Sequence, residues 1–283
     1  MTTHAPLAGR RKVDAGLPFV YLVALVIVGV TIAPVVYVVI GGFRTTGQIN
    51  ADPGGWPDPW VLDKYAGVFS NPNFWTQFLN SSIVALLTTA GVVLLGVMAA
   101  FVIARYSFRG RNVLFSLFTA GLLFPLTVAV LPLFTMLRGL GLLGSLAAVI
   151  IPQIAFALPT TIIILVPFLR AIPDEIEEAA FIDGCSRLGF FFRMVVRLSL
   201  PGVITVGILA FIGAWNSYLL PLFILNDPST FTLPLGVQAF SSQYSVDTAR
   251  VLAFTALSML PALIFFSLFE RRIVGGLTGA VKG

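Results

Sequence analysis

Chemically reactive side chains are almost missing from this sequence. Its 283 residues include one cysteine, Cys185, and one histidine, His4. One cysteine excludes an intrachain disulfide and a thiol cluster for metal or redox work. One histidine, in the polar N-terminal stretch, leaves zinc hydrolysis and histidine-based proton transfer almost nothing to work with. We therefore expect no catalytic residues and no metal site.

Charged residues are also scarce. Charged residues make up 10% of the chain and hydrophobic residues 58%, against about 25% and about 45–50% in soluble domains. The charges lie between long uncharged runs, as expected when hydrocarbon excludes them at a cost of roughly 2.5–3.5 kcal/mol each. This composition excludes a soluble surface. The net charge of +5 collects at the ends of the apolar runs, which indicates membrane topology rather than nucleic-acid binding.

Six uncharged runs are long enough to cross a bilayer core of about 30 Å, which takes about 20 helical residues. They are continuous rather than alternating, so they predict helices and not a β-barrel. The predicted spans lie near residues 17–41, 80–104, 113–136, 146–169, 201–224 and 251–269. The first run is longer than the apolar part of a cleaved signal peptide, which has about 7–15 residues, so we expect a retained span. Prolines inside the spans predict kinked helices.

The basic residues set the orientation. Six spans put both termini on one side, and with that side cytoplasmic 13 of the 17 Lys and Arg residues fall in inner segments. The positive-inside rule favours this topology. The expected organisation is a cytoplasmic tail over residues 1–16, a six-helix membrane domain over 17–270 and a cytoplasmic tail over 271–283.

The inner loop over residues 170–200 is unlike the rest of the chain, because it holds five of the twelve acidic residues. Pro173 followed by acidic residues suits the first turn of a helix, and Gly184 suits its C-terminal stop. Ser186 can then cap a second helix that runs towards Leu198. The pattern predicts a short helix, a sharp turn and a second helix.

A solvated acidic linker is the alternative interpretation of this loop. A linker needs neither the tight glycine turn nor the small apolar strip that Ile176, Ala179 and Ala180 would form on one side of the first helix. Small side chains on this helix would let it fit closely into a cleft of a partner protein. We therefore favour a docking helix.

This loop resembles a known family signature. The run Glu178-Ala179-Ala180-x-x-Asp183-Gly184, followed by Pro201, resembles the "EAA" signature of permease subunits in ATP-binding-cassette importers. The resemblance extends to the six spans, to Arg105-Tyr-Ser-Phe-Arg-Gly after the second and to Ala214-Trp215-Asn216 in the fifth. The tail from Gly276 to Gly283 is similar to that of the maltose-type, carbohydrate-uptake branch.

The resemblance implies an all-α membrane protein with the type I importer permease fold and a cytoplasmic coupling helix. In that family the coupling helix sits in a cleft of the ATPase subunit, a role that would fall here to Glu178, Ala179, Ala180, Asp183 and Gly184. The tail would contact the ATPase pair through Gly276, Leu277, Thr278 and Lys282. The implied setting is the bacterial plasma membrane, with both termini cytoplasmic. The implied partners are a second homologous permease, two ATPase subunits and an extracytoplasmic solute-binding protein.

The energy for transport is expected to come from these partners. No Asp, Glu, Lys, Arg or His lies within the six span cores, whereas ion-coupled carriers commonly need such groups. The three lysines, Lys12, Lys64 and Lys282, lie in no phosphate-binding loop of the G-x-x-x-x-G-K-[ST] type. We therefore expect this chain to bind no cofactor, and ATP and Mg²⁺ to be bound by the ATPase subunits.

The polar groups inside the spans are neutral, which suits a sugar, because amides and aromatic faces hold hydroxylated ligands without charge. Gln153 and Asn216 lie about eight residues from the predicted outer ends of their spans, hence at a similar depth of roughly 12 Å. The expected substrate pathway comprises Asn216, Trp215, Tyr218, Gln153 and Asn80. The alternative for the two amides is hydrogen bonding between helices.

Other functions remain open from the sequence. They are import of a non-sugar solute such as a glycerophosphodiester or peptide, secondary transport or channel activity by this chain alone, and membrane enzymology. The aromatic outer segments 42–79 and 225–250 suit either an interfacial belt or a docking surface for an external partner.

Overall fold

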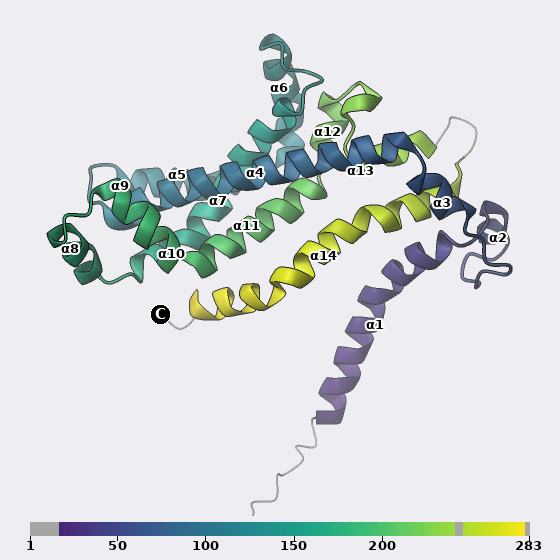
Figure 1. Ribbon diagram of the computed structural model, residues 1–283, viewed down its shortest axis with the longest axis horizontal. Helices are drawn as coiled ribbons and strands as arrows, with labels where there is room; N and C mark the ends of the chain where they lie inside the picture. The colour runs from purple at the N-terminus through teal and green to yellow at the C-terminus, as the bar shows by residue number, and fades with distance from the viewer. Residues whose placement is uncertain (1–16, 241–245, 281–283) are drawn as a thin grey trace, which may run out of the picture.

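The computed structural model describes residues 17–240 and 246–280. Four long helices form the body of the molecule and pack along one another (Figure 1), namely α4 (Pro72–Arg105), α7 (Ala147–Arg170), α11 (Leu200–Trp215) and α14 (Thr248–Ala280). α1 (Leu17–Gly41) diverges from this body and meets α14 near its own C-terminal end. Four of the described helices are long and apolar enough to cross a membrane, and two bent pairs bring the number to as many as six. The expected all-α membrane class is confirmed.

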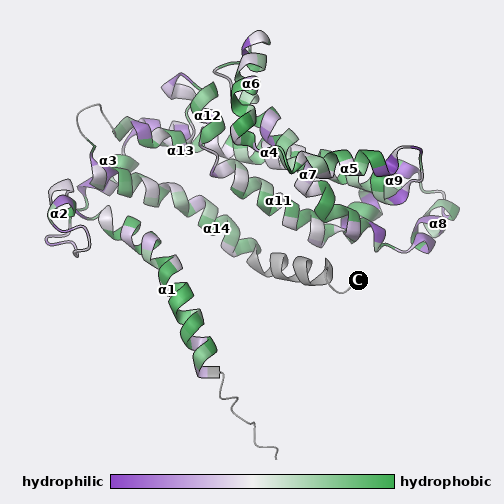
Figure 2. Cartoon of the chain, turned by 180° about the vertical axis from the view of Figure 1, so that it is seen from behind, coloured by the Kyte–Doolittle hydropathy of each residue, from purple (hydrophilic) through white to green (hydrophobic). Residues whose placement is uncertain are grey.

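Polar and apolar residues are separated along the length of the molecule. Apolar residues follow the long helices, while polar residues gather at the two opposite ends (Figure 2). One end carries α8 (Asp174–Ile182), α9 (Arg187–Phe190), a π-helix (Phe191–Val195) and α10 (Val196–Leu198). The other end carries α2 (Thr46–Ala51), α3 (Asp63–Phe69), α13 (Leu233–Gly236) and two short 3₁₀ segments (Pro228–Thr230 and Val237–Phe240). The bilayer therefore lies between these ends, and we call the α8 end inner and the α2 end outer, following the expected topology.

α4 and α7 pack along each other, and small residues let them approach closely. A Cβ atom at Gly96 of α4 would lie 2.3 Å from Cγ2 of Thr161 on α7. A Cβ atom at Gly91 would meet Ile154 at the same distance, 2.3 Å. Close packing of side chains on small residues is a usual means of joining helices in lipid, where no hydrophobic effect drives them together.

The third predicted span is not one helix. It consists of α5 (Arg111–Gly121) and α6 (Leu126–Gly139), bent by 99°. The break falls just before Pro125, because proline disfavours the helical conformation of the residue that precedes it. The prolines predict a kinked helix over residues 113–136; the structure has a full break there instead, and α6 projects sideways from the body (Figure 1).

The fifth predicted span is also shorter than expected. α11 ends at Trp215, and a separate helix, α12 (Leu219–Ile224), follows. Pro221 has no N–H to donate to the carbonyl of residue 217 and its ring clashes with that carbonyl, so a helix cannot continue through this point without loss. The prediction of one helix over residues 201–224 is wrong for this reason.

Candidate functional site

The inner loop folds as the sequence predicts at its N-terminal half. Pro173 precedes α8, and three acidic residues occupy its first turn. Gly184 adopts φ +79° directly after the helix, a left-handed conformation that suits glycine. The Cys185 N–H then donates to the carbonyl of Ala180 at 2.9 Å. The Ser186 hydroxyl caps the next helix by accepting from the N–H of Gly189 at 3.1 Å.

The second helix of the loop differs from the expectation of one regular helix from Ser186 to Leu198. It passes from α9 through a π-helical turn over Phe191–Val195 into α10, and then bends by 79° into α11. The wider π-turn lets Phe190, Phe191 and Val195 all be buried against the inner ends of α4 and α7. π-turns of this kind often mark functional segments.

Arg105, the last residue of α4, fixes the position of α8. Its guanidinium is 6% exposed and lies 2.8 Å from a carboxylate oxygen of Asp174 and 2.8 Å from one of Glu177. It also donates to the carbonyl of Ile172 at 2.6 Å. This set of contacts, which we call the Arg105 clamp, joins the inner end of α4 to α8 and to Ile172 in the segment that precedes α8. Charge-assisted bonds of this kind are about twice as strong as neutral ones.

The sequence alone did not point to the Arg105 clamp. Arg105 counts there as one of several inner basic residues, and 72 residues separate it from Glu177. The sequence feature that could have indicated the clamp is an arginine at the inner end of a predicted span, because the acidic loop can reach that arginine.

The candidate coupling residues lie on different sides of α8. Ala180 is 5% exposed and belongs to the inner apolar cluster with Phe190 and Ile172. Glu178, Ala179, Asp183 and Gly184 are exposed. Ala179 and Asp183 also line a surface depression of about 380 Å³ whose floor includes Met194. Exposed acidic residues beside a shallow depression lined by small residues form a surface that a partner subunit can bind.

The predicted tail contacts fall on α14 and beyond it. α14 continues to Ala280 and therefore includes Gly276, Leu277 and Thr278, and it runs toward the inner end of the molecule (Figure 1). Lys282 lies outside the described residues.

Gln153 is the best placed of the predicted pathway residues. Its side-chain oxygen accepts from the hydroxyl of Thr88 at 3.4 Å across the α4–α7 contact. Its side-chain nitrogen is buried and has no hydrogen-bond partner among the described residues. Leaving a buried amide N–H without a partner is costly. A ligand hydroxyl that reached this position would accept a hydrogen bond from it and remove that cost.

Asn216 and Gln153 do not lie at one depth, contrary to the prediction. Trp215 packs on Phe78 of α4, with ring centroids 6.0 Å apart, whereas Gln153 contacts Thr88. Ten positions of helix separate Phe78 from Thr88, which is about 15 Å. The prediction failed because the depth of Asn216 was counted from residue 224, although α11 ends at Trp215.

Two further pathway residues are used for packing instead. Trp215 is 3% exposed, and its indole N–H donates to the carbonyl of Ser258 at 3.1 Å, which ties α11 to α14. The Asn80 amide donates to the carbonyls of Ser229 and Phe231 at 2.8 and 3.0 Å, so it holds the outer loop. Both predictions of a direct pathway role are corrected by these contacts.

The remaining two predicted pathway residues are exposed at the outer end. Asn216 forms the C-cap of α11. The Tyr218 hydroxyl accepts from the side-chain amide of Gln238 at 3.0 Å. Each presents a polar group beside the mouth of the bundle.

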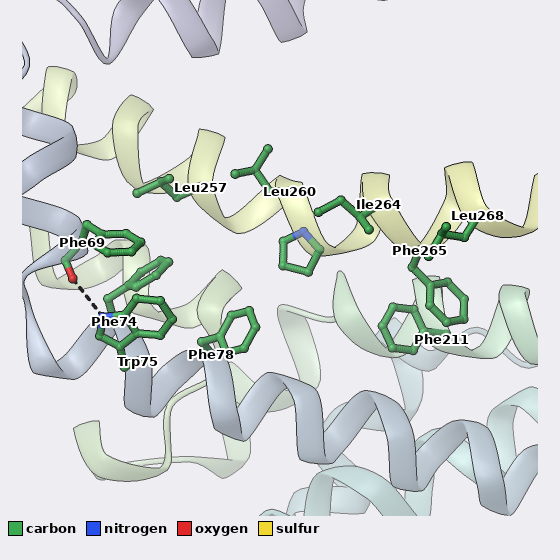
Figure 3. A pocket seen from close by; sticks show the side chains of 11 residues that line it. Phe69, Phe74, Trp75, Phe78, Phe211, Leu257, Leu260, Ile264, Phe265 and Leu268 are labelled. Atoms are coloured by element: carbon green, nitrogen blue, oxygen red, sulfur yellow. Dashed lines mark hydrogen bonds between the residues drawn. The ribbon is translucent and has the colours of Figure 1, made fainter.

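A large apolar groove between α14 and the helices α4 and α11 is unsuited to sugar. It encloses about 450 Å³, and Figure 3 shows the leucines of α14 facing the aromatic side chains of α4 and α11 across it. The indole N–H of Trp75 is already bonded to the carbonyl of Phe69 at 2.9 Å. The groove therefore offers a hydroxylated ligand no polar group to hold it.

The outer end is held together by a charged node around Asp247. Its carboxylate accepts from the hydroxyl of Thr46 at 2.9 Å and lies 3.6 Å from the ammonium of Lys64. Burial by itself would raise the pKa of Asp247, but the bonds from Thr46 and Arg250 and the charges of Lys64 and Arg250 lower it overall. This node, which we call the Asp247 node, joins α2, α3 and α14.

Comparison with known proteins agrees with this architecture. Residues 92–274 match the family model described as the binding-protein-dependent transport system inner membrane component. The chain is 35% identical to the sulfoquinovosyl glycerol transport system permease protein SmoH of Agrobacterium fabrum, over the full length of both chains. It is 36% identical to the diacetylchitobiose uptake system permease protein NgcG of Streptomyces coelicolor, over 88% of this chain and 83% of that protein. It is also 36% identical to the trehalose transport system permease protein SugB of Mycobacterium tuberculosis, over 91% and 94%.

Solved structures share the fold. A chain of a bacterial ABC transporter involved in the import of the acidic polysaccharide alginate superposes with a TM-score of 0.78 and 19% identity, covering 94% of this chain and 99% of that one. A second structure, of the alginate transporter in complex with an alginate pentasaccharide-bound periplasmic protein, gives a TM-score of 0.64 at 14% identity, covering 91% and 95%.

Proposed function

Because this chain belongs to the family of binding-protein-dependent transport system inner membrane components, we propose that it is a permease subunit of an ATP-driven importer of a sugar or oligosaccharide. The observation that carries the proposal is α8, an exposed acidic helix clamped by Arg105 to a membrane-spanning helix. The cargoes named for the relatives support a carbohydrate.

The chain works with partners that supply energy and cargo. ATP and Mg²⁺ bind to two ATPase subunits, and the permease itself catalyses no reaction. A second, homologous permease completes the pathway, and an extracytoplasmic binding protein delivers the cargo to the outer end. The alginate transporter in complex with a periplasmic protein supports such a partner. The excess of basic residues in the inner segments supports a plasma-membrane protein with cytoplasmic termini.

Coupling passes through α8. Glu178, Ala179, Asp183 and Gly184 contact the ATPase subunit, with the mostly buried Ala180 supporting the helix from beneath, and closure of the ATPase pair displaces α8. The Arg105 clamp transfers this displacement to α4, which packs along α7. Gly276, Leu277, Thr278 and Lys282 provide a second contact with the ATPase pair.

The cargo crosses beside the Thr88–Gln153 pair. The unpartnered amide N–H of Gln153 donates to a cargo hydroxyl as it passes. Asn216 and Tyr218 contribute polar groups at the outer mouth. Neutral groups suit a neutral hydroxylated cargo.

The test uses the complex assembled from both permeases, the ATPase subunits and the binding protein in liposomes. Glu178→Lys is expected to lose co-purification with the ATPase and to abolish uptake, because it reverses charge on the gripping surface. A bulky residue at Gly184 should have the same effect. Asp63→Lys, a charge reversal on an exposed residue of the outer end, is the matched control and should retain the ATPase.

Two outcomes would contradict the proposal. Unchanged ATPase attachment and uptake in Glu178→Lys would remove α8 from coupling. Solute flux through the purified chain without any ATPase would identify a stand-alone carrier. A panel of sugars and non-sugar solutes, including a glycerophosphodiester, then identifies the cargo by its stimulation of ATP hydrolysis.

A further inference from the structure

The two sides of α8 differ in burial. Ala180 is buried and Ile176 is half-buried, and both pack into the inner apolar cluster. The other side of the helix is exposed at four positions that are separated by three or four residues: Glu175, Glu178, Ala179 and Ile182. Residues at this spacing lie on one face of a helix. α8 therefore presents an outward face that the rest of the chain does not cover.

The outward face ends in a large apolar side chain. Ile182 is 85% exposed, as much as any large apolar side chain in the part of the chain that the structure describes. The exposed carboxylates of Glu178 and Asp183 flank it, one turn before and one residue after. Hydrocarbon excludes such charges, so the exposure of Ile182 is not contact with lipid.

Single exposed apolar side chains are common on protein surfaces, so the position of Ile182 decides its meaning. It shares one face of α8 with Glu178 and Ala179, two of the residues that the proposed function places against the ATPase subunit. A surface that covers Glu178 and Ala179 therefore also covers Ile182.

The charges around Ile182 limit the choice of partner. Glu175 and Glu178 share its face, and α8 contains no basic residue. A second copy of this chain docked here would bring like charges together, which is unfavourable. The complementary surface is an apolar pocket with basic or neutral groups around it.

We propose that Ile182 is the apolar anchor with which α8 binds the ATPase subunit. This inference rests on the proposed function and assigns a role to a position that the EAA signature leaves open. Ile182 fills a pocket of the ATPase subunit, and Glu178 orients α8 one turn away. Interfaces concentrate their binding energy in a few centrally buried side chains, and burial of one exposed isoleucine strengthens binding by about tenfold to a hundredfold.

The test measures the affinity of the purified ATPase subunits for the permease pair in lipid nanodiscs. Ile182→Ala should weaken binding about thirtyfold, and it should not unfold the loop, because so exposed a side chain contributes little packing. Ile182→Leu keeps the apolar volume and should stay within about fivefold of wild type. Leu123→Ala, at an equally exposed leucine between α5 and α6, is the matched control and should bind as wild type does.

Glu178→Gln separates the anchor from the charge. It removes one exposed carboxylate without reversing its sign, so it should weaken binding by at most about fivefold. A loss in Glu178→Gln equal to or larger than that in Ile182→Ala would show that charge dominates the contact and would overturn the proposal.

The remaining outcomes distinguish the anchor from the proposed function. Wild-type affinity in Ile182→Ala, with loss of the ATPase in Glu178→Lys, would overturn the anchor and leave the proposed function intact. Wild-type affinity in both variants would overturn both. In the assembled complex, a photo-crosslinking amino acid in place of Ile182 should label an ATPase subunit. Labelling of a permease chain or of lipid alone would overturn the proposal.

Discussion

At the scale of single residues, Arg105 joins several interactions on one buried side chain at the inner end. The Arg105 side chain is buried and its guanidinium faces one carbonyl and two carboxylates, of which Glu177 is partly buried and Asp174 is exposed. Removing Arg105 leaves Glu177 without its cationic partner. Arg105 is therefore the residue at which the inner loop is most sensitive to substitution.

We expect Arg105→Ala to destabilise the inner loop by about 1–3 kcal/mol, because the partly buried carboxylate of Glu177 would lose its charge-assisted hydrogen bonds. Hydrogen–deuterium exchange of residues 172–184 should rise sharply, and coupling to the ATPase should fall. Arg109→Ala, at an exposed arginine in the same segment, is the control and should leave exchange unchanged. Protection equal to wild type in Arg105→Ala would show that the clamp does not stabilise the loop.

Asp247 predicts a pH dependence at the outer end. Its pKa is lowered in the folded chain, so the unfolded state binds more protons, and the node stabilises the fold at pH values above the unfolded pKa of about 3.9. That stabilisation is lost as the pH falls below this value through the lowered folded pKa. Limited proteolysis of the outer loops between about pH 6 and 3 should show this loss. Asp247→Asn should already be sensitive at neutral pH and should show a weaker dependence.

The sequence could predict only the local part of these sites. Gly184 and Ser186 signal a turn and a cap through their own backbone chemistry, so α8 and the start of α9 were predictable. Arg105 was not, because its partners are distant in sequence. Asn80 was misassigned for the same reason, since an amide near the end of a span looks alike whether it faces cargo or a carbonyl 149 residues away.

At the scale of elements, α4 and α7 form the pair on which the bundle depends. Glycines allow their close approach, because a side chain at Gly91 or Gly96 would collide with Ile154 or Thr161. Continuous apolar runs predicted both helices correctly. The prolines inside the spans predict kinks, but not that the third run divides into two helices bent by 99° or that α11 ends at Trp215 before Pro221, because hydropathy does not change at these points.

The α4–α7 contact can be tested at Gly96. Gly96→Val should lower the stability by about 1–3 kcal/mol, because the added side chain must displace Thr161. A lower midpoint of thermal unfolding in detergent would measure this effect. Gly213→Val, in α11, is the matched control, because a Cβ atom at Gly213 would have no neighbouring atom within 4 Å. A Gly96→Val chain as stable as the control would mean that the two helices separate without cost.

At the scale of the whole molecule, the two polar ends must face opposite sides of the membrane. Ile182 on α8 is 85% exposed and Trp56 in the outer segment is 72% exposed. With Cys185 replaced by serine, Ile182→Cys should react with a membrane-impermeant maleimide only in inside-out vesicles. Trp56→Cys should react only in right-side-out vesicles. Labelling of both from one side would contradict the topology.

The length of α4 has a consequence for communication across the membrane. With 34 residues it measures about 51 Å. It is anchored to the outer loop at Asn80 and Ser81, within its outer third, and to α8 at its inner end through Arg105. A helix is stiff along its axis. On the proposed function, a displacement of α8 that reaches α4 through Arg105 would therefore move the outer loop together with the inner loop, and docking of a binding protein at the outer end would act on the same helix.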